Sequence, residues 1–172
     1  MIRILGIDPG SNNTGYGIID VEGNHSVHIE NGTIHIDLPE LPEKLNTIFS
    51  ELTKVIELHQ PDEVAIEKVF MHKNADSALK LGQARGAAIT ACSVMQQKVF
   101  EYTANQIKQA TVGKGHAAKE QVQHMVKILL CLKEVPQADA ADALAVAICH
   151  AHFREGLKRM AGVKGSRGGR LL

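Results

Sequence analysis

The chain has 172 residues, of which 44% are hydrophobic, and its 19 basic side chains balance its 19 acidic ones. This length fits one domain with a buried core, and the composition is too apolar for a disordered chain. No run approaches the roughly 20 apolar residues of a membrane-spanning helix, and the N-terminus begins with a strand pattern instead of a secretory signal. The three scattered cysteines, Cys92, Cys131 and Cys149, predict reduced, buried thiols in a cytoplasmic protein.

The charge is unevenly distributed along the chain. Residues 1–100 carry 8 basic and 13 acidic side chains, whereas residues 101–172 carry 11 basic and 6 acidic ones. The neutral total therefore does not exclude a polyanionic partner. We expect one domain over residues 1–153 and a basic, flexible tail over residues 154–172. The tail is either simply solvated or an arm that touches nucleic acid.

The first third of the chain reads as three strands followed by a helix. The apolar run of residues 2–7 predicts a buried strand, and the segments 14–20 and 26–36 predict two further strands joined by short turns. Short connections favour antiparallel pairing. Residues 41–59 have apolar side chains at helical spacing and a proline in the first turn, which predicts a helix.

The remainder alternates strands and helices. Residues 63–67 and 98–102 predict short strands, and a polar stretch follows the first of them. Three helices are expected, over residues 76–96, 117–132 and 138–153. This order predicts an α/β fold with one mixed sheet and helices on its faces.

Four acidic residues lie in unusual surroundings. Asp8 and Glu67 each end an apolar strand, and Asp139 and Asp142 share one face of a helix that is otherwise mostly Ala, Leu, Val and Ile. Each has an ordinary explanation taken alone: a turn cap for Asp8, a lysine partner for Glu67, or a favourable helix first turn for the other two.

Taken together, the four acids suggest a metal centre. If the strands that end in Asp8 and Glu67 are parallel neighbours, their carboxylates converge at one edge of the sheet. Carboxylates about 4 Å apart repel by roughly 4 kcal/mol at an effective dielectric constant near 20, so the cluster needs a cation. Oxygen ligands select hard ions such as Mg²⁺ or Mn²⁺, and a pair of such ions is suited to phosphodiester displacement.

The motifs around these acids are similar to those of a known family. Residues 4–11 with 14–17, 65–70, 73–86 and 136–145 resemble the RuvC Holliday-junction resolvases, and the match runs from about residue 2 to residue 152. The resemblance implies an RNase H-like fold with a mixed five-stranded sheet and helices on both faces. It also implies a homodimer that resolves four-way junctions in recombination and repair by paired, symmetric nicks. By this resemblance the protein is a crossover junction endodeoxyribonuclease.

The resemblance also implies the roles of individual residues and the partners. Catalysis and metal binding fall to Asp8, Glu67, Asp139 and Asp142, with Mg²⁺ as the cofactor, two ions per site and Mn²⁺ as a substitute. Basic residues near the site map onto Lys108 and Lys119. The RuvA–RuvB branch-migration complex is the implied protein partner.

Further DNA contacts are suggested by the residues themselves. Phe70 is followed by cationic side chains, so it is either a core residue or a stacking surface for an unpaired base. Lys73, Lys80 and Arg85 extend a basic strip suited to phosphates. Gly82 and Gly86 lie four apart on an alanine-rich helix, which either contacts a second copy or packs within the chain.

Three other functions compete with this interpretation. An actin-like or sugar-kinase-like phosphotransferase also begins with a strand, an Asp and a Gly-Ser/Thr loop, but it needs two such halves. A non-catalytic junction-binding protein has no use for four carboxylates that face phosphates. A related nuclease that processes ribosomal RNA precursors does not match residues 70–86.

Overall fold

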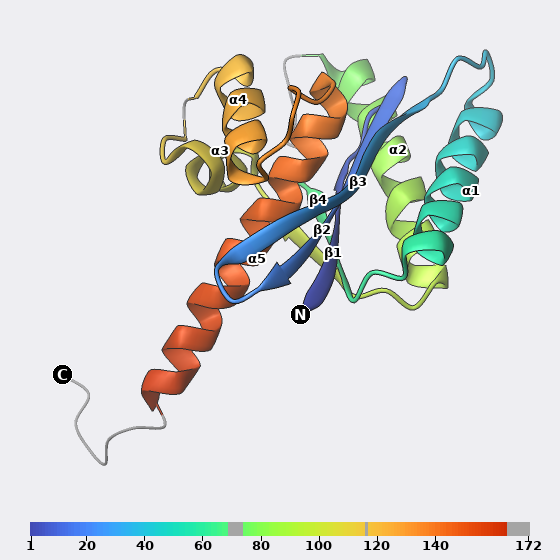
Figure 1. The fold of residues 1–172 in the computed structure, drawn as a ribbon. Coiled ribbons are helices and arrows are strands. Elements are labelled where there is room, and N and C mark those ends of the chain that lie inside the picture. The colour runs from blue at the N-terminus through green and yellow to red at the C-terminus, as the bar shows by residue number, and fades with distance from the viewer. Residues whose placement is uncertain (69–73, 116, 165–172) are drawn as a thin grey trace.

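The computed structural model describes residues 1–68, 74–115 and 117–164, which form one layered α/β unit (Figure 1). Its five-stranded sheet has the strand order β3-β2-β1-β4-β5. The strand β1 pairs antiparallel with β2 and parallel with β4, so the sheet is mixed. The strands are β1 (Ile2–Asp8), β2 (Asn13–Glu22), β3 (His25–His35), β4 (Glu63–Glu67) and β5 (Val99–Tyr102).

Helices cover both faces of this sheet, as the sequence predicts. One hydrophobic cluster lies between the sheet and the helices α1 and α2, and a second lies between the sheet and α3, α4 and α5. Figure 1 shows the two groups on opposite sides of the strands. The helices are α1 (Leu41–His59), α2 (Ala75–Val94), α3 (Ala104–Val112), α4 (Lys119–Leu129) and α5 (Ala138–Lys164). In the described part of the chain, no helix is long and apolar enough to cross a membrane.

The structure corrects three expectations. The helix α3 has no counterpart among the predicted elements. The helix α5 continues past its predicted end at Phe153 to Lys164, and Arg154, the first residue of the expected tail, pairs with Glu63 on β4. Cys131 is exposed, so the prediction of three buried thiols is wrong there, although all three thiols are free.

Glycines let α5 lie directly on the sheet. A side chain at Gly6 of β1 would collide with the backbone carbonyl of Ala143, and one at Gly17 of β2 would lie 2.6 Å from Leu144 Cγ. Small residues at these points bring the helix backbone against the strands. The helix α5 therefore packs directly on β1 and β2. This close packing fixes the distance between its first turn and the sheet.

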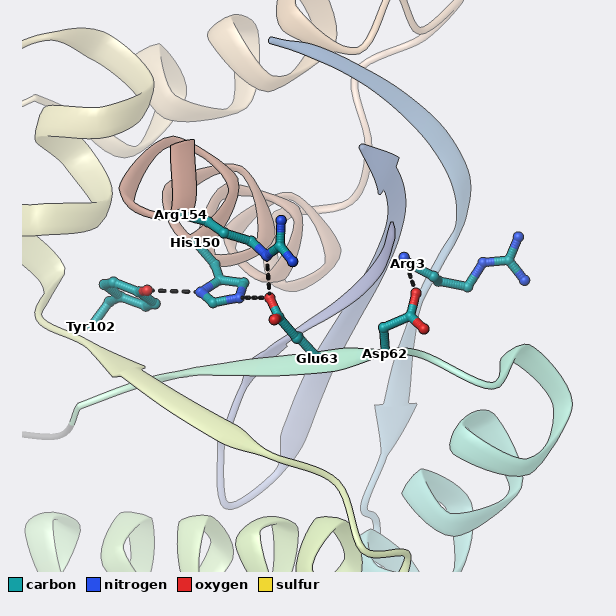
Figure 2. Close-up of polar contacts among 6 residues, drawn as sticks. All are labelled: Arg3, Asp62, Glu63, Tyr102, His150 and Arg154. Carbon is teal, nitrogen blue, oxygen red and sulfur yellow. Dashed lines mark hydrogen bonds and ion pairs between the residues drawn. The ribbon is translucent and has the colours of Figure 1, made fainter. Parts of the chain in front are cut away.

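Farther along α5, a buried polar network ties the helix to β4 and β5 (Figure 2). His150 lies between two partners: Tyr102 Oη is 2.7 Å from its Nδ1, and Glu63 Oε2 is 2.8 Å from its Nε2. Arg154 Nε donates to the same carboxylate oxygen at 2.9 Å. Burial lowers the pKa of His150, which favours a neutral ring that donates to Glu63 and accepts from Tyr102.

Replacing Tyr102 by phenylalanine is expected to destabilise the protein by about 1–3 kcal/mol, because it leaves Nδ1 of the buried His150 without a donor. Urea unfolding at neutral pH measures this difference. The aromatic ring is retained, so its packing on Phe153, with centroids 5.2 Å apart, is kept. Unchanged stability would mean that the hydroxyl of Tyr102 contributes nothing to the fold.

Candidate active site

Two of the predicted acids meet at the carboxyl edge of the sheet. Ile7 of β1 pairs with Ile66 of β4 in the parallel ladder, so the next residues, Asp8 and Glu67, stand side by side at the two strand ends. Side chains alternate along a strand, so Asp8 points to the same face as Gly6, which lies against α5. The expected convergence of these two carboxylates is therefore present in the fold.

The other two acids are brought to the same edge by α5. Asp139 and Asp142 lie in the first turns of this helix. Gly15, which pairs with Asp8 across β1 and β2, has no side chain, and a Cβ there would collide with the carbonyl of Asp139. The helix therefore begins directly above the residue that faces Asp8.

The four carboxylates influence one another through charge. Burial and the charges of Glu67, Asp142 and Asp139 raise the pKa of Asp8 to about 8, against the opposing effect of Lys119. Burial and Asp142 also raise the pKa of Glu67. Burial, followed by a smaller effect of Asp139, raises the pKa of Asp142 despite its bond to Lys119. Burial is the largest cause in each case and repulsion between the carboxylates adds to it, so a cation at this site would stabilise their ionised forms.

Two lysines face this acidic group from α3 and α4. Lys119 is the first residue of α4, and its Nζ lies 2.9 Å from Asp142 Oδ2. This bond and the nearby acids raise the pKa of Lys119. Lys108 on α3 lies close enough to lower the pKa values of Glu67 and Asp142 by its charge. Both lysines that the family resemblance placed near the site are therefore found there.

The donor set fits a hard divalent cation. The four acidic side chains offer only carboxylate oxygens, and burial together with neighbouring carboxylates raises the pKa values of Asp8, Glu67 and Asp142. Among the residues that the structure describes, no three His, Cys, Asp or Glu side chains are gathered closely enough to hold a metal ion as they stand. The ammonium group of Lys119 is the cation that bonds to Asp142 in this structure.

Of the remaining predicted DNA contacts in the described part of the chain, Lys80 is exposed and Arg85 is half-buried. Lys80 on α2 is 58% exposed and forms an ion pair with Asp76 at 2.7 Å. Arg85 donates from Nε to the carbonyl of Glu67 at 3.2 Å and pairs with Glu101 at 2.7 Å. In this structure Arg85 therefore connects the end of β4 to β5. Phe70 and Lys73 lie outside the described residues.

Sequence reasoning missed two groups of residues that shape the site. The glycines Gly6, Gly15 and Gly17 were part of the matching motifs, but their function as contacts for α5 becomes visible only in three dimensions. The helix α3, which carries Lys108, was not predicted. Its signal is the capping box of Thr103 and Gln106, whose side chains each bond to the other's backbone N–H.

Comparison with known proteins identifies close relatives. Residues 4–150 match the family model described as crossover junction endodeoxyribonuclease RuvC. A crossover junction endodeoxyribonuclease RuvC of Shewanella sp. (strain W3-18-1) is 56% identical over 162 residues, which is 94% of either chain. A relative of the same name from Shewanella piezotolerans is 56% identical over 167 residues, covering 97% of this chain and 96% of the relative.

Solved structures agree with these sequence matches. The RuvC of T. thermophilus in complex with a Holliday junction substrate superimposes with a TM-score of 0.85 at 33% identity, covering 91% of this chain and 96% of that one. The yeast mitochondrial Holliday junction resolvase Ydc2 has a TM-score of 0.69 at 12% identity, covering 93% of this chain and 83% of that one, and this likeness concerns the fold alone. The expected RNase H-like fold is confirmed.

Proposed function

The chain belongs to the RuvC family of crossover junction endodeoxyribonucleases, and on this premise we propose that it resolves Holliday junctions by paired, symmetric nicks. The observation that carries the proposal is the meeting of Asp8 and Glu67 with the first turns of α5 at one sheet edge. The phosphotransferase, the non-catalytic binder and the ribosomal RNA nuclease are not supported by these relatives.

We assign catalysis and metal binding to Asp8, Glu67, Asp139 and Asp142. The family acts with a divalent metal, and we propose Mg²⁺, two ions per site, with Mn²⁺ able to substitute. When bound, the ions supply Lewis-acid stabilisation of the phosphate and a more acidic water. The carboxylates would hold this charge in place, and because the pKa of Asp8 is raised to about 8, a bound ion would compete there with a proton near neutral pH.

The basic residues around the carboxylates orient the DNA in this proposal. Lys119 and Lys108 place positive charge beside the acids, where a scissile phosphate approaches. Lys80, on the exposed side of α2, contacts the sugar–phosphate backbone. Arg85, which is half-buried and paired with Glu101, supports the end of β4. We also propose that Phe70 stacks on an unpaired base and that Lys73 contacts a phosphate.

We further propose that the active form is a homodimer, since two identical sites related by a twofold axis match the two nicks. The helix α2 divides its small residues between two faces. Ala84, Ala88 and Ala91 are buried within the chain. A side chain at Gly82 or Gly86 would meet nothing within 4 Å. The packing of the alanines is thus intramolecular, and the glycine face is left for a second copy.

The wider cellular setting follows from this function. The RuvA–RuvB branch-migration complex is the proposed partner, and the cytoplasm is the proposed location, where free thiols such as Cys92 remain reduced. We also propose a domain over residues 1–153 and a basic tail over residues 154–172, of which the structure describes residues 154–164 as the end of α5. The pairing of Arg154 with Glu63 ties at least the start of that segment to the domain.

A cleavage assay tests the proposed function. The protein is incubated with a synthetic four-way junction and with a linear duplex of the same sequence, in Mg²⁺ and in EDTA. We expect paired nicks on the junction only, and only with the metal. Selective binding without any cleavage in Mg²⁺ or Mn²⁺ would instead support the non-catalytic binder.

Replacing Gly86 by glutamate is expected to weaken the dimer without unfolding the protomer, because the added side chain meets open space within the chain. Two like charges near a twofold axis repel each other in the dimer. Sedimentation equilibrium over a range of concentrations measures the shift toward monomer. Thr90→Glu, one turn farther along α2 at another exposed position, tests how far the interface extends. A monomeric wild-type protein would contradict the dimer proposal.

A further inference from the structure

A polar cleft lies beside the proposed active site, on the other face of the sheet. It encloses about 400 Å³ between the turn that follows β1, the first turns of α1, and the start of α2. Ser11, in its wall, is only three residues beyond Asp8. The cleft therefore lies near the same carboxyl edge of the sheet that carries the acids. Its lining residues are Ser11, Asn12, Pro39, Leu41, Lys44, Leu45, Ile48, Ser77, Lys80 and Ala84.

The chemistry of this lining favours a negatively charged occupant. Lys44 and Lys80 are its charged members, and no acidic side chain is among the described residues that form its wall. Two hydroxyl groups and the amide of Asn12 add hydrogen-bond donors. Such a mixture of ammonium, hydroxyl and amide groups is the usual set of protein contacts to DNA phosphates.

Lys44 lies in the wall of the cleft and contacts a second wall residue. Its Nζ lies 3.5 Å from Asn12 Oδ1, in the turn after β1. The side chain is half-buried, unlike the exposed Lys54 on the same helix. Lys80, on α2 in the same lining, forms an ion pair with Asp76, with 2.7 Å between Nζ and Oδ2. Lys44 is thus the cleft's cation without an acidic partner among the described residues.

From this geometry we propose that the cleft binds a backbone phosphate of the junction DNA, with Lys44 as its principal contact. The inference rests on the proposed function and adds a DNA-positioning residue on α1. A strand that reaches the carboxylates on the α5 side of the sheet edge crosses the turn at Ser11 to the α1 side. The cleft then holds the strand at a second point, outside the cleavage site, and limits its movement over the acids.

The test compares Lys44→Ala with the wild-type protein in binding to a labelled four-way junction. Anisotropy titrations are made in EDTA, which blocks cleavage, between about 50 and 200 mM salt. We expect the Kd to rise about 3- to 10-fold for Lys44→Ala, and the slope of log K against log salt to fall by about 0.9 for each phosphate that the variant no longer neutralises. Lys44→Arg keeps the charge and should retain the slope.

Lys54→Ala is the matched control, because this exposed lysine of α1 pairs locally with Glu51 at 2.7 Å and lies outside the cleft. It should leave both the Kd and the slope unchanged.

If Lys44→Ala keeps the wild-type Kd and slope while the wild-type protein cleaves junctions, the cleft is not a phosphate site and the proposed function stands. If the wild-type protein neither binds nor cleaves junctions, the proposed function itself fails. A loss of affinity equal in Lys44→Ala and Lys44→Arg would show a steric effect and overturn the phosphate contact.

Discussion

Asp8→Asn is expected to lower the rate of junction cleavage by about 1000-fold or more and to leave junction binding intact. An amide is a poor ligand for a hard cation, and a metal centre contributes several kcal/mol to transition-state stabilisation, with about 1.4 kcal/mol for each tenfold in rate. Binding should persist, because the substitution removes a negative charge from a surface that meets phosphates. Single-turnover cleavage and metal-free binding on the same junction measure the two effects.

The matched control is Glu57→Gln, which also exchanges a carboxylate for an amide but at an exposed position of α1. It should cleave at the wild-type rate. A parallel loss of cleavage and binding in Asp8→Asn would mean that Asp8 organises the DNA surface and is not a ligand of the metal.

Asp8→Asn is also expected to change how the stability of the protein depends on pH, and this effect is independent of catalysis. The folded protein raises the pKa of Asp8 from 3.8 to about 8, with burial as the largest cause. Between these values the folded state binds a proton that the unfolded chain has released, so the stability of the metal-free protein falls as the pH rises. This loss is complete above about pH 8 and absent below about pH 4.

Asparagine cannot ionise, so Asp8→Asn should be more stable than the wild-type protein in EDTA, by a margin that grows from pH 5 and levels off near pH 8. A gain of about 1 kcal/mol corresponds to a Tm increase of roughly 2–4 °C in a chain of this size. Differential scanning fluorimetry in EDTA across this pH range measures it. A difference in Tm that is constant with pH would contradict the raised pKa.

The positions of the acids could be predicted from sequence because they depend on simple regularities. Apolar runs that end in Asp8 and Glu67 place both at strand ends, and the helix between residues 41 and 59 allows the parallel pairing that sets them side by side. The spacing of Asp139 and Asp142 places them on one helix face.

Other parts of the site depend on contacts between distant segments, which no local pattern contains. The pairing of Arg85 with Glu101 joins a helix to an edge strand, and the sequence alone suggested a DNA contact for that arginine. The cleft around Lys44 combines three separate segments of the chain. The helix α3 was missed because it buries few side chains, Ile107 and Thr111 among the described ones, and so has a weak apolar pattern.

Gly15→Ala is expected to displace the start of α5 while the sheet keeps its fold. The new methyl group would collide with the carbonyl of Asp139, while β2 is held between β1 and β3 on either side. The start of α5 must therefore move away from Asp8. A displacement of about 1 Å at a reacting centre can cost about 100-fold in rate, whereas overpacking costs about 1–3 kcal/mol of stability.

Gly17→Ala provides the comparison, because its methyl group would meet Leu144 farther along the same helix, with the side-chain Cγ at 2.6 Å and the backbone nitrogen at 2.9 Å. This contact lies farther along α5 than Asp139, so the variant should lose stability with a smaller displacement of Asp139 than in Gly15→Ala. Gly156→Ala, with nothing within 4 Å in the outer part of α5, should be neutral or up to about 1 kcal/mol more stable.

Cleavage rates and Tm values are measured for all three. If Gly15→Ala and Gly17→Ala lose activity only in proportion to their loss of Tm, the start of α5 is not what positions the carboxylates. If Gly15→Ala loses about 100-fold in cleavage and still binds junctions, the close contact of β2 with the first turn of α5 is a requirement of the chemistry.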